Sequence, residues 1–360
     1  MRKLPTCRKA LAWHEAAYAK GVAVGLKSLA HGHGIPFAKG EVNVPDALAV
    51  AVVKYARKIL ELQQKFDIPS LVSMRPRKII KFVGAFHSWY LSEALDDATR
   101  KRIKDYLSPL FNYAHFRDGK KYEVENGKII IAPGNWCSLD YLEMLGAKWC
   151  CYCNDGHLYT KTLDGGRPAM RSPFDHYFPR RDFPMLGLTL LNLVPVCHDC
   201  NSGRKGERYF DVAEYAYPYL DDFHNSCEIA VDMKGNGIRL FLHKGNVGDV
   251  SISFKGRDET SVCKRTETFL KTIKIERLYN DELQDRALKC IREIETFPQS
   301  RRRFLKKLFV DMIDEDIAND HFGVSLNPDK INIEQHGKMV IDIVKDLAPR
   351  RWFGDLKQKE

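Results

Sequence analysis

The sequence predicts an α+β protein in which mainly helical N- and C-terminal regions flank a central cysteine-rich segment, with small β-hairpins on either side. Apolar residues recur at three- and four-residue steps over 46–66, the spacing of one face of an amphipathic helix. Helical spacing returns at 86–110 and from about 267 onward. Asn-Gly and Gly-Asn-Gly sequences at 126–127 and 235–237 favour hairpin turns.

The turn and cap residues justify these elements in chain order. Pro45 and Asp46 indicate the start of the first amphipathic helix, and Pro69 follows its end. Asp96 and Asp97 lie near another helix start, and Gly146 can end a short helix at 139–145. The remaining expectations are a hairpin within 121–135, strands at 228–233, 238–242 and 250–254, a loop at 321–327 and a helix at 340–347.

The length of 360 residues suggests two or three domains. We expect a helical binding or regulatory region at 1–120, a metal-stapled domain at 121–225, and a β-hairpin plus helices at 226–360. No window approaches the ~20 continuous apolar residues that a membrane span needs. Charged residues interrupt any apolar stretch near the N-terminus, so we expect a cytoplasmic protein without a membrane partner.

The net charge of +10 is unevenly distributed along the chain. Residues 1–148 hold 24 Lys and Arg against 14 Asp and Glu, whereas residues 211–360 hold 25 against 27. A basic N-terminal side favours a polyanion such as DNA or RNA as the partner. Charge alone fits a solvated basic surface equally well.

The sequence has ten cysteines, and in a reducing compartment they are not expected to form disulfides. Five of them fall in two tight clusters. Cys150 and Cys153 form one Cys-x-x-Cys pair, and Cys197 and Cys200 form another. Two residues between thiolates allow one turn to direct both sulfurs at one ion, and four thiolates complete a tetrahedral Zn²⁺ site. Because such a site has no open position, the sequence predicts one structural zinc.

The segment between the pairs contains groups that are suited to catalysis. Asp175 and His176 are adjacent, Asn192 lies sixteen residues after the histidine, and Asn201 directly follows the last cysteine. The order Cys-x-x-Cys, Asp-His, Asn, Cys-x-x-Cys-Asn resembles the zinc-stapled branch of the HNH, or His-metal-finger, nucleases. An isolated Asp-His pair would more often be a surface pair, so the prediction depends on the whole arrangement.

This resemblance implies a ββα-metal core with a treble-clef-like structural zinc, and a metal-dependent endonuclease that hydrolyses DNA. It implies that His176 is the general base, that Asp175 and Asn201 hold a catalytic Mg²⁺ or Mn²⁺, and that Asn192 fixes the loop that carries the histidine. Where other HNH enzymes have a final histidine, this chain has Asn201. A looser likeness over about 107–298 to prokaryotic HNH endonucleases implies a role in anti-phage defence, with an ATPase as a candidate regulatory partner.

Basic residues flank the Asp-His pair and could hold phosphates beside it. These candidate nucleic-acid contacts are Arg180, Arg181, Arg204, Lys205 and Arg208. Two other readings compete with a DNA endonuclease: a nuclease that acts on RNA, and a non-catalytic zinc-stapled module that binds nucleic acid or supports assembly.

Overall fold

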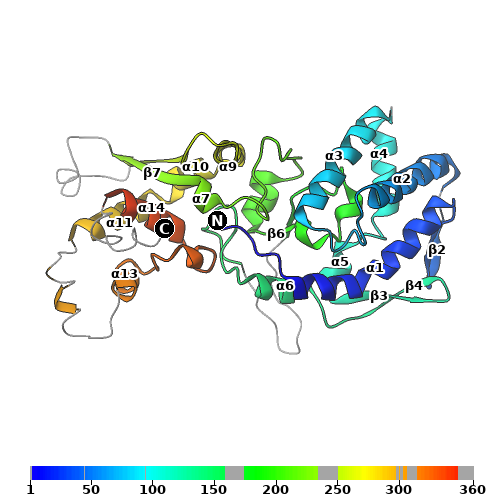
Figure 1. The fold of residues 1–360 in the computed structure, drawn as a ribbon, viewed down its shortest axis with the longest axis horizontal. Helices are drawn as coiled ribbons and strands as arrows, with labels where there is room; N and C mark the ends of the chain where they lie inside the picture. The colour runs from blue at the N-terminus through cyan, green and yellow to red at the C-terminus, as the bar shows by residue number, and fades with distance from the viewer. Residues whose placement is uncertain are drawn as a thin grey trace.

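The computed structural model describes residues 2–43, 45–93, 95–158, 174–233, 250–296, 300, 303–305 and 314–347, and it confirms the α+β class. The molecule is elongated, with the N-terminal elements at one end and the C-terminal elements at the other (Figure 1). The cysteine-rich segment lies between them. Among the described residues, no helix is both long enough and apolar enough to span a membrane.

Helices dominate the N-terminal end, as the apolar spacing predicts. In the helix predicted at 46–66, Val52, Ile59 and Leu62 all face the core and are almost fully buried. The Asp96 side chain accepts a hydrogen bond from the Thr99 backbone and caps the helix that follows. The helices here are α1 (Arg8–Ala30), α2 (Asp46–Lys65), α3 (Pro76–Ser92), α4 (Asp97–Leu107) and α5 (Tyr113–Arg117).

A four-stranded sheet in the order β2-β1-β4-β3 packs beside α1. It consists of β1 (Ile35–Phe37), β2 (Gly40–Val42), β3 (Lys120–Glu125) and β4 (Lys128–Pro133). Asn126 and Gly127 both have positive φ, 48° and 76°, as a two-residue hairpin turn requires. Because β4 also pairs with β1, the predicted hairpin belongs to the N-terminal sheet, and the expected boundary after residue 120 separates strands that form one sheet.

The central region has few regular elements. Helix α6 (Ser138–Leu145) ends at Gly146, whose φ of 64° is left-handed, as predicted. Strands β5 (Phe174–His176) and β6 (Leu193–Pro195) pair in antiparallel fashion and are linked by two short 3₁₀ turns, η1 (Pro184–Leu186) and η2 (Leu190–Asn192). A short π-helix, η3 (Asp199–Lys205), follows β6. The order is therefore strand, strand, helical segment.

The C-terminal end pairs a two-stranded sheet with helices. Strand β7 (Cys227–Met233) follows α7 (Phe223–Ser226) and pairs with β8 (Val250–Gly256), while the expected turn at 235–237 and strand at 238–242 lie outside the described residues. The loop expected at 321–327 begins later, because α13 (Asp314–Phe322) includes its first two residues. The remaining elements are α9 (Ser261–Thr272), α10 (Ile275–Glu282), α11 (Gln284–Thr296), η5 (Pro328–Ile333) and α14 (Gly337–Leu347).

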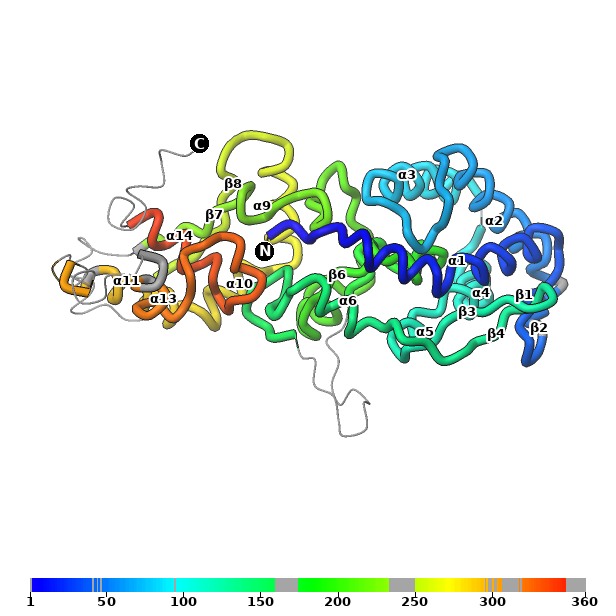
Figure 2. Tube along the Cα trace, turned by 60° about the horizontal axis from the view of Figure 1, so that its bottom comes forward, coloured from blue at the N-terminus to red at the C-terminus, as the bar shows by residue number. Residues whose placement is uncertain are grey.

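The segment before α1 joins the two ends of the molecule. The Leu4 amide donates to the Pro218 carbonyl, and Arg2 forms ion pairs with Asp222 at 3.1 Å and Asp329 at 2.9 Å. From there α1 runs along the molecule toward the N-terminal sheet (Figure 2). One continuous segment therefore contacts the C-terminal elements, passes the central region and forms part of the N-terminal core.

Candidate metal centre and histidine site

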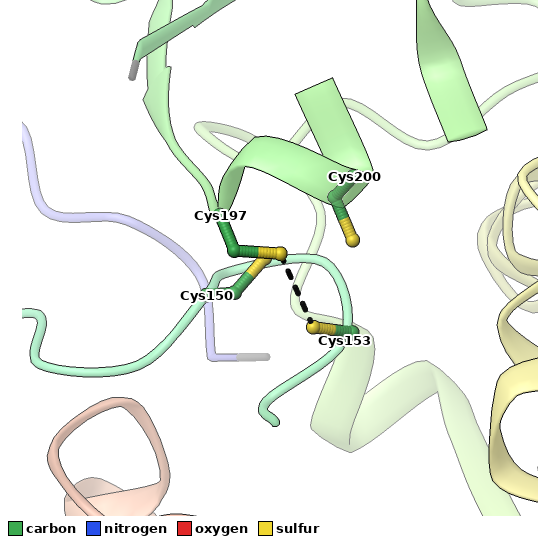
Figure 3. Close-up of side chains that lie close together, drawn as sticks. All are labelled: Cys150, Cys153, Cys197 and Cys200. Carbon is green, nitrogen blue, oxygen red and sulfur yellow. Dashed lines mark hydrogen bonds between the residues drawn. The ribbon is translucent and has the colours of Figure 1, made fainter. Parts of the chain in front are cut away.

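The four predicted cysteines converge on one point. The sulfurs of Cys150, Cys153, Cys197 and Cys200 all lie within 4.8 Å of one another, and three of the four residues are buried. Figure 3 shows the first pair on a loop and the second pair where β6 leads into η3, with the side chains directed inward. The cluster joins two segments that are far apart in the sequence.

The loop around the first pair is shaped to present both sulfurs. Asn154 has a left-handed φ of 57°, and its amide donates to the Cys150 carbonyl. The Gly156 amide donates to the Cys153 sulfur at 3.4 Å. A Cβ atom on Gly156 would lie 2.4 Å from the Cys197 Cβ, so the second pair can approach only because this residue has no side chain.

The donor set fits a tetrahedral metal ion. A zinc ion with Zn–S bonds of about 2.3 Å keeps its sulfurs roughly 3.8 Å apart. The Cys153 and Cys197 sulfurs are 3.9 Å apart. Hydrogen bonds with Cys150 raise the pKa of both the Cys153 and Cys200 thiols, because a thiol that donates to a neighbouring sulfur holds its proton more tightly. The four-cysteine group could thus hold a structural metal such as zinc, as predicted.

Asp175 lies in the middle of β5, and both of its carboxylate oxygens have partners. Its side chain is almost completely buried. Lys205 Nζ lies 3.0 Å from Oδ1, and the Tyr152 hydroxyl donates to Oδ2 at 2.6 Å. Burial raises the pKa of Asp175, opposed by the positive charge of Lys205 and the two hydrogen bonds.

This environment differs from the expected Mg²⁺ or Mn²⁺ site. A hydrated divalent ion needs free carboxylate oxygens and room for several water molecules. Asp175 offers neither, because the Lys205 ammonium group supplies the positive charge at Oδ1. Asn201, the second expected ligand, is partly buried in η3, where its backbone amide donates to the Cys197 carbonyl and its backbone carbonyl accepts from the Gly206 amide. The described arrangement therefore does not fit a catalytic Mg²⁺ at Asp175.

His176 ends β5, and its ring is held by two contacts. Its Nε2 lies 3.1 Å from the Gly187 carbonyl oxygen, and the Tyr113 ring packs edge-on at 5.2 Å. Burial, together with the positive charge of Arg180, lowers the pKa of His176 to about 3. A carbonyl can only accept, so the neutral ring carries its proton on Nε2 and leaves a lone pair on Nδ1.

Asn192 connects the two sides of the loop after His176. Its Oδ1 accepts a hydrogen bond from the Phe178 amide at 2.8 Å, and its Nδ2 donates to the Phe178 carbonyl at 3.1 Å. Its own carbonyl accepts from the Tyr177 amide. The side chain is completely buried, so the loop that begins at the histidine is fixed at both ends by one residue.

The five basic candidates have different environments. Arg180 and Arg181 are exposed, and Arg181 pairs with Asp182 at 3.1 Å. Arg204 and Arg208 donate to backbone carbonyls of Lys274 and Thr272. Lys205 was expected at the surface but is buried, since its ammonium group compensates Asp175 and also donates to the His176 carbonyl. Lys205 is therefore not available to phosphate in this arrangement.

Sequence reasoning did not find Tyr152, Tyr113 or Gly187, which contact the Asp-His pair from three different segments. Tyr152 lies between the cysteines of the first pair, and its place beside two metal ligands is the one sequence signal that could have indicated a position near the site. No local pattern identifies the other two, because only the tertiary fold brings them to β5.

Comparisons with known proteins give one local match. The chain is 39% identical over 49 residues to the Escherichia phage lambda protein named "Protein ea31", a segment that covers 13% of this chain and 17% of that protein. No family model matches the chain. No solved structure matches it.

Proposed function

We propose that the chain is a zinc-stapled endonuclease of the HNH type that hydrolyses phosphodiester bonds in DNA, with His176 as the general base. The observation that supports this proposal best is the state of the His176 ring. Its Nε2 is engaged by the Gly187 carbonyl, so the neutral imidazole presents Nδ1 as a fixed proton acceptor. In this proposal one Zn²⁺ binds the four cysteines and fixes η3 against the strands.

The charges around His176 suit an anionic substrate. Arg180 is exposed four residues after His176, and its positive charge contributes to the low pKa of that ring. A phosphodiester that pairs with Arg180 would neutralise that charge and add a negative one. Both effects favour the imidazolium form and raise the pKa of His176, which makes Nδ1 a better base when substrate is bound.

The roles of the chain's own residues follow from these contacts. His176 accepts the proton of the attacking water at Nδ1, and the Gly187 carbonyl stabilises the resulting imidazolium through Nε2–H. The water oxygen bonds to phosphorus as the bond from phosphorus to the leaving nucleoside oxygen breaks, and that oxygen takes a proton from solvent. Asn192 holds the backbone on both sides of the loop, so the ring is oriented before substrate arrives. Arg180 neutralises phosphate charge.

The test is a cleavage assay with purified full-length chain on supercoiled plasmid, in Mg²⁺, in Mn²⁺ and in EDTA, beside His176→Ala. We expect nicking or linearisation by the wild type and a loss on the order of 100-fold or more in the variant, since a general base contributes about 10²–10⁴-fold. Zinc content measured on both proteins shows whether the centre is retained. Cleavage by His176→Ala at the wild-type rate would exclude this residue as the base.

The buried Asp175–Lys205 pair favours a second candidate, a non-catalytic zinc-stapled module that binds nucleic acid. Because Lys205 and Tyr152 contact both oxygens of this carboxylate, it can have a purely structural role that needs no metal. If the wild type binds duplex DNA but cuts neither duplex DNA, single strands nor RNA in any metal, this module replaces the nuclease. Cleavage of RNA alone would instead change the substrate class.

A further inference from the structure

The loop that holds His176 is itself held by the N-terminal region. Gly187 and Leu188 are consecutive, so the two carbonyls belong to adjacent peptide groups. The first accepts from His176, and the second accepts from His14 Nε2 at 2.7 Å. His14 lies on α1 and is completely buried.

The proton position on His14 follows from its partners. The indole Nε1–H of Trp136 can only donate, and it lies 3.0 Å from His14 Nδ1. Nδ1 therefore accepts, which places the His14 proton on Nε2, where it donates to Leu188. Burial keeps the ring neutral by lowering the pKa of His14 to about 4. Both ring nitrogens of His14 thus have one defined partner.

Other N-terminal contacts restrict the same loop. The Thr189 hydroxyl donates to the Leu71 carbonyl at 2.9 Å, and the Leu190 amide donates to the Val72 carbonyl at 3.0 Å. A Cβ atom on Gly187 would lie 2.5 Å from the Phe111 carbonyl oxygen. The loop is therefore packed against three N-terminal segments.

We propose that His14, fixed by Trp136, is a positioning residue: through Leu188 it sets the peptide whose Gly187 carbonyl orients His176. This inference rests on the proposed function for its kinetic consequence, although its structural part does not. The N-terminal region would then orient the His176 ring without contacting substrate, because α1 carries His14.

The test compares His14→Leu, His14→Gln and Trp136→Phe in the full-length chain. Leucine leaves the buried Leu188 carbonyl without a donor, whereas the glutamine amide can still reach it. We expect kcat to fall on the order of 10- to 100-fold in His14→Leu with KM little changed, because a displaced base loses near-attack geometry. Glutamine recovers most of that loss. The Trp136→Phe variant keeps an aromatic ring but frees His14 Nδ1, so a smaller loss is expected.

A second readout does not depend on cleavage. Nitrogen NMR of the histidine rings shows which nitrogen of His176 carries the proton. We expect Nε2 in the wild type and a mixture of both forms in His14→Leu. His33→Leu, at an exposed histidine, is the matched control and leaves both readouts unchanged. Circular dichroism and zinc content verify the fold, and if His14→Leu does not fold, Trp136→Phe provides the same comparison.

The outcomes separate the two proposals. Folded His14→Leu and Trp136→Phe proteins with wild-type kcat and an unchanged His176 proton position would overturn the positioning role. Absence of cleavage by the wild type under all conditions would overturn the nuclease. In that case a changed proton position in His14→Leu still supports the positioning role, and an unchanged one refutes it.

Discussion

At the scale of single residues, Gly156 controls whether the two cysteine pairs can meet. Gly156→Ala would place a Cβ atom 2.4 Å from the Cys197 Cβ and 2.7 Å from its sulfur, and neither atom belongs to a flexible side-chain end. We expect weaker zinc binding and a loss of about 1–3 kcal/mol in the free energy of unfolding, typical of overpacking. Zinc content and thermal unfolding measure the two effects.

The control for this substitution is Gly203→Ala. Apart from its chain neighbours and the backbone of its own helical segment, no atom lies within 4 Å of the position that its Cβ would occupy, and its φ is not left-handed. The same chemical change there should leave zinc content unaltered. Equal zinc retention in the two variants would mean that the loop around Gly156 can move to make room for a Cβ atom. In that case the close packing of Cys197 against residue 156 does not require a glycine.

At the scale of elements, the Asp175–Lys205 ion pair joins β5 to the end of η3. Lys205→Met removes the cation and leaves a buried carboxylate without compensation, so we expect the free energy of unfolding to fall by about 3–5 kcal/mol. The double variant Asp175→Asn, Lys205→Met removes both charges and should be clearly more stable than the single one. Urea unfolding of the three proteins provides the comparison.

The same variants test whether a divalent ion can use Asp175. If Mn²⁺ raises the Tm of Lys205→Met but not that of the wild type or the double variant, the carboxylate can accept a metal once the ammonium group is gone. If Mn²⁺ has no effect on any of them, Asp175 serves only to hold the two elements together. Equal stability of the single and double variants would contradict a buried, charged pair.

Elements with local signals could be predicted from the sequence, and elements that depend on distant partners could not. The helix at 46–65 follows from apolar spacing, and the turn at 126–127 from residues that tolerate positive φ. The four cysteines could be assigned because metal geometry dictates their spacing. By contrast, the parallel pairing of Phe37 with Ile129 has no local signature.

The histidine site illustrates the same limit. The resemblance carried by the Asp-His and asparagine motifs singles out Asp175, His176, Asn192 and Asn201, because these residue types stand at the spacings of that family. The burial of Lys205 could not be inferred, since a basic residue after the last cysteine equally suits a surface. The His14 contact with Leu188 joins positions that are 174 residues apart in the sequence, and nothing local to α1 distinguishes this histidine from an ordinary core residue.

At the scale of the whole molecule, histidines whose pKa is lowered by burial predict how stability depends on pH, and His14 and His224 are two of them. Burial lowers the pKa of His14 to about 4, and burial with nearby cations, among them Lys338, lowers the pKa of His224 to about 2. In the unfolded chain both titrate near 6.5. Below that pH the unfolded state binds protons that the folded state does not, so the free energy of unfolding falls as the pH falls.

The size of this effect can be stated for pH 5, which is above the ordinary pKa of carboxylates. Each of the two histidines should lower the free energy of unfolding by about 2 kcal/mol between pH 8 and about pH 5, and their full contribution is present above pH 6.5. Urea unfolding at both pH values measures the change. His14→Gln removes one titrating group, so its loss over the same interval should be smaller by about 2 kcal/mol. An identical loss in the variant and the wild type would mean that His14 is protonated in the folded protein, which is incompatible with its acceptance of the Trp136 hydrogen bond.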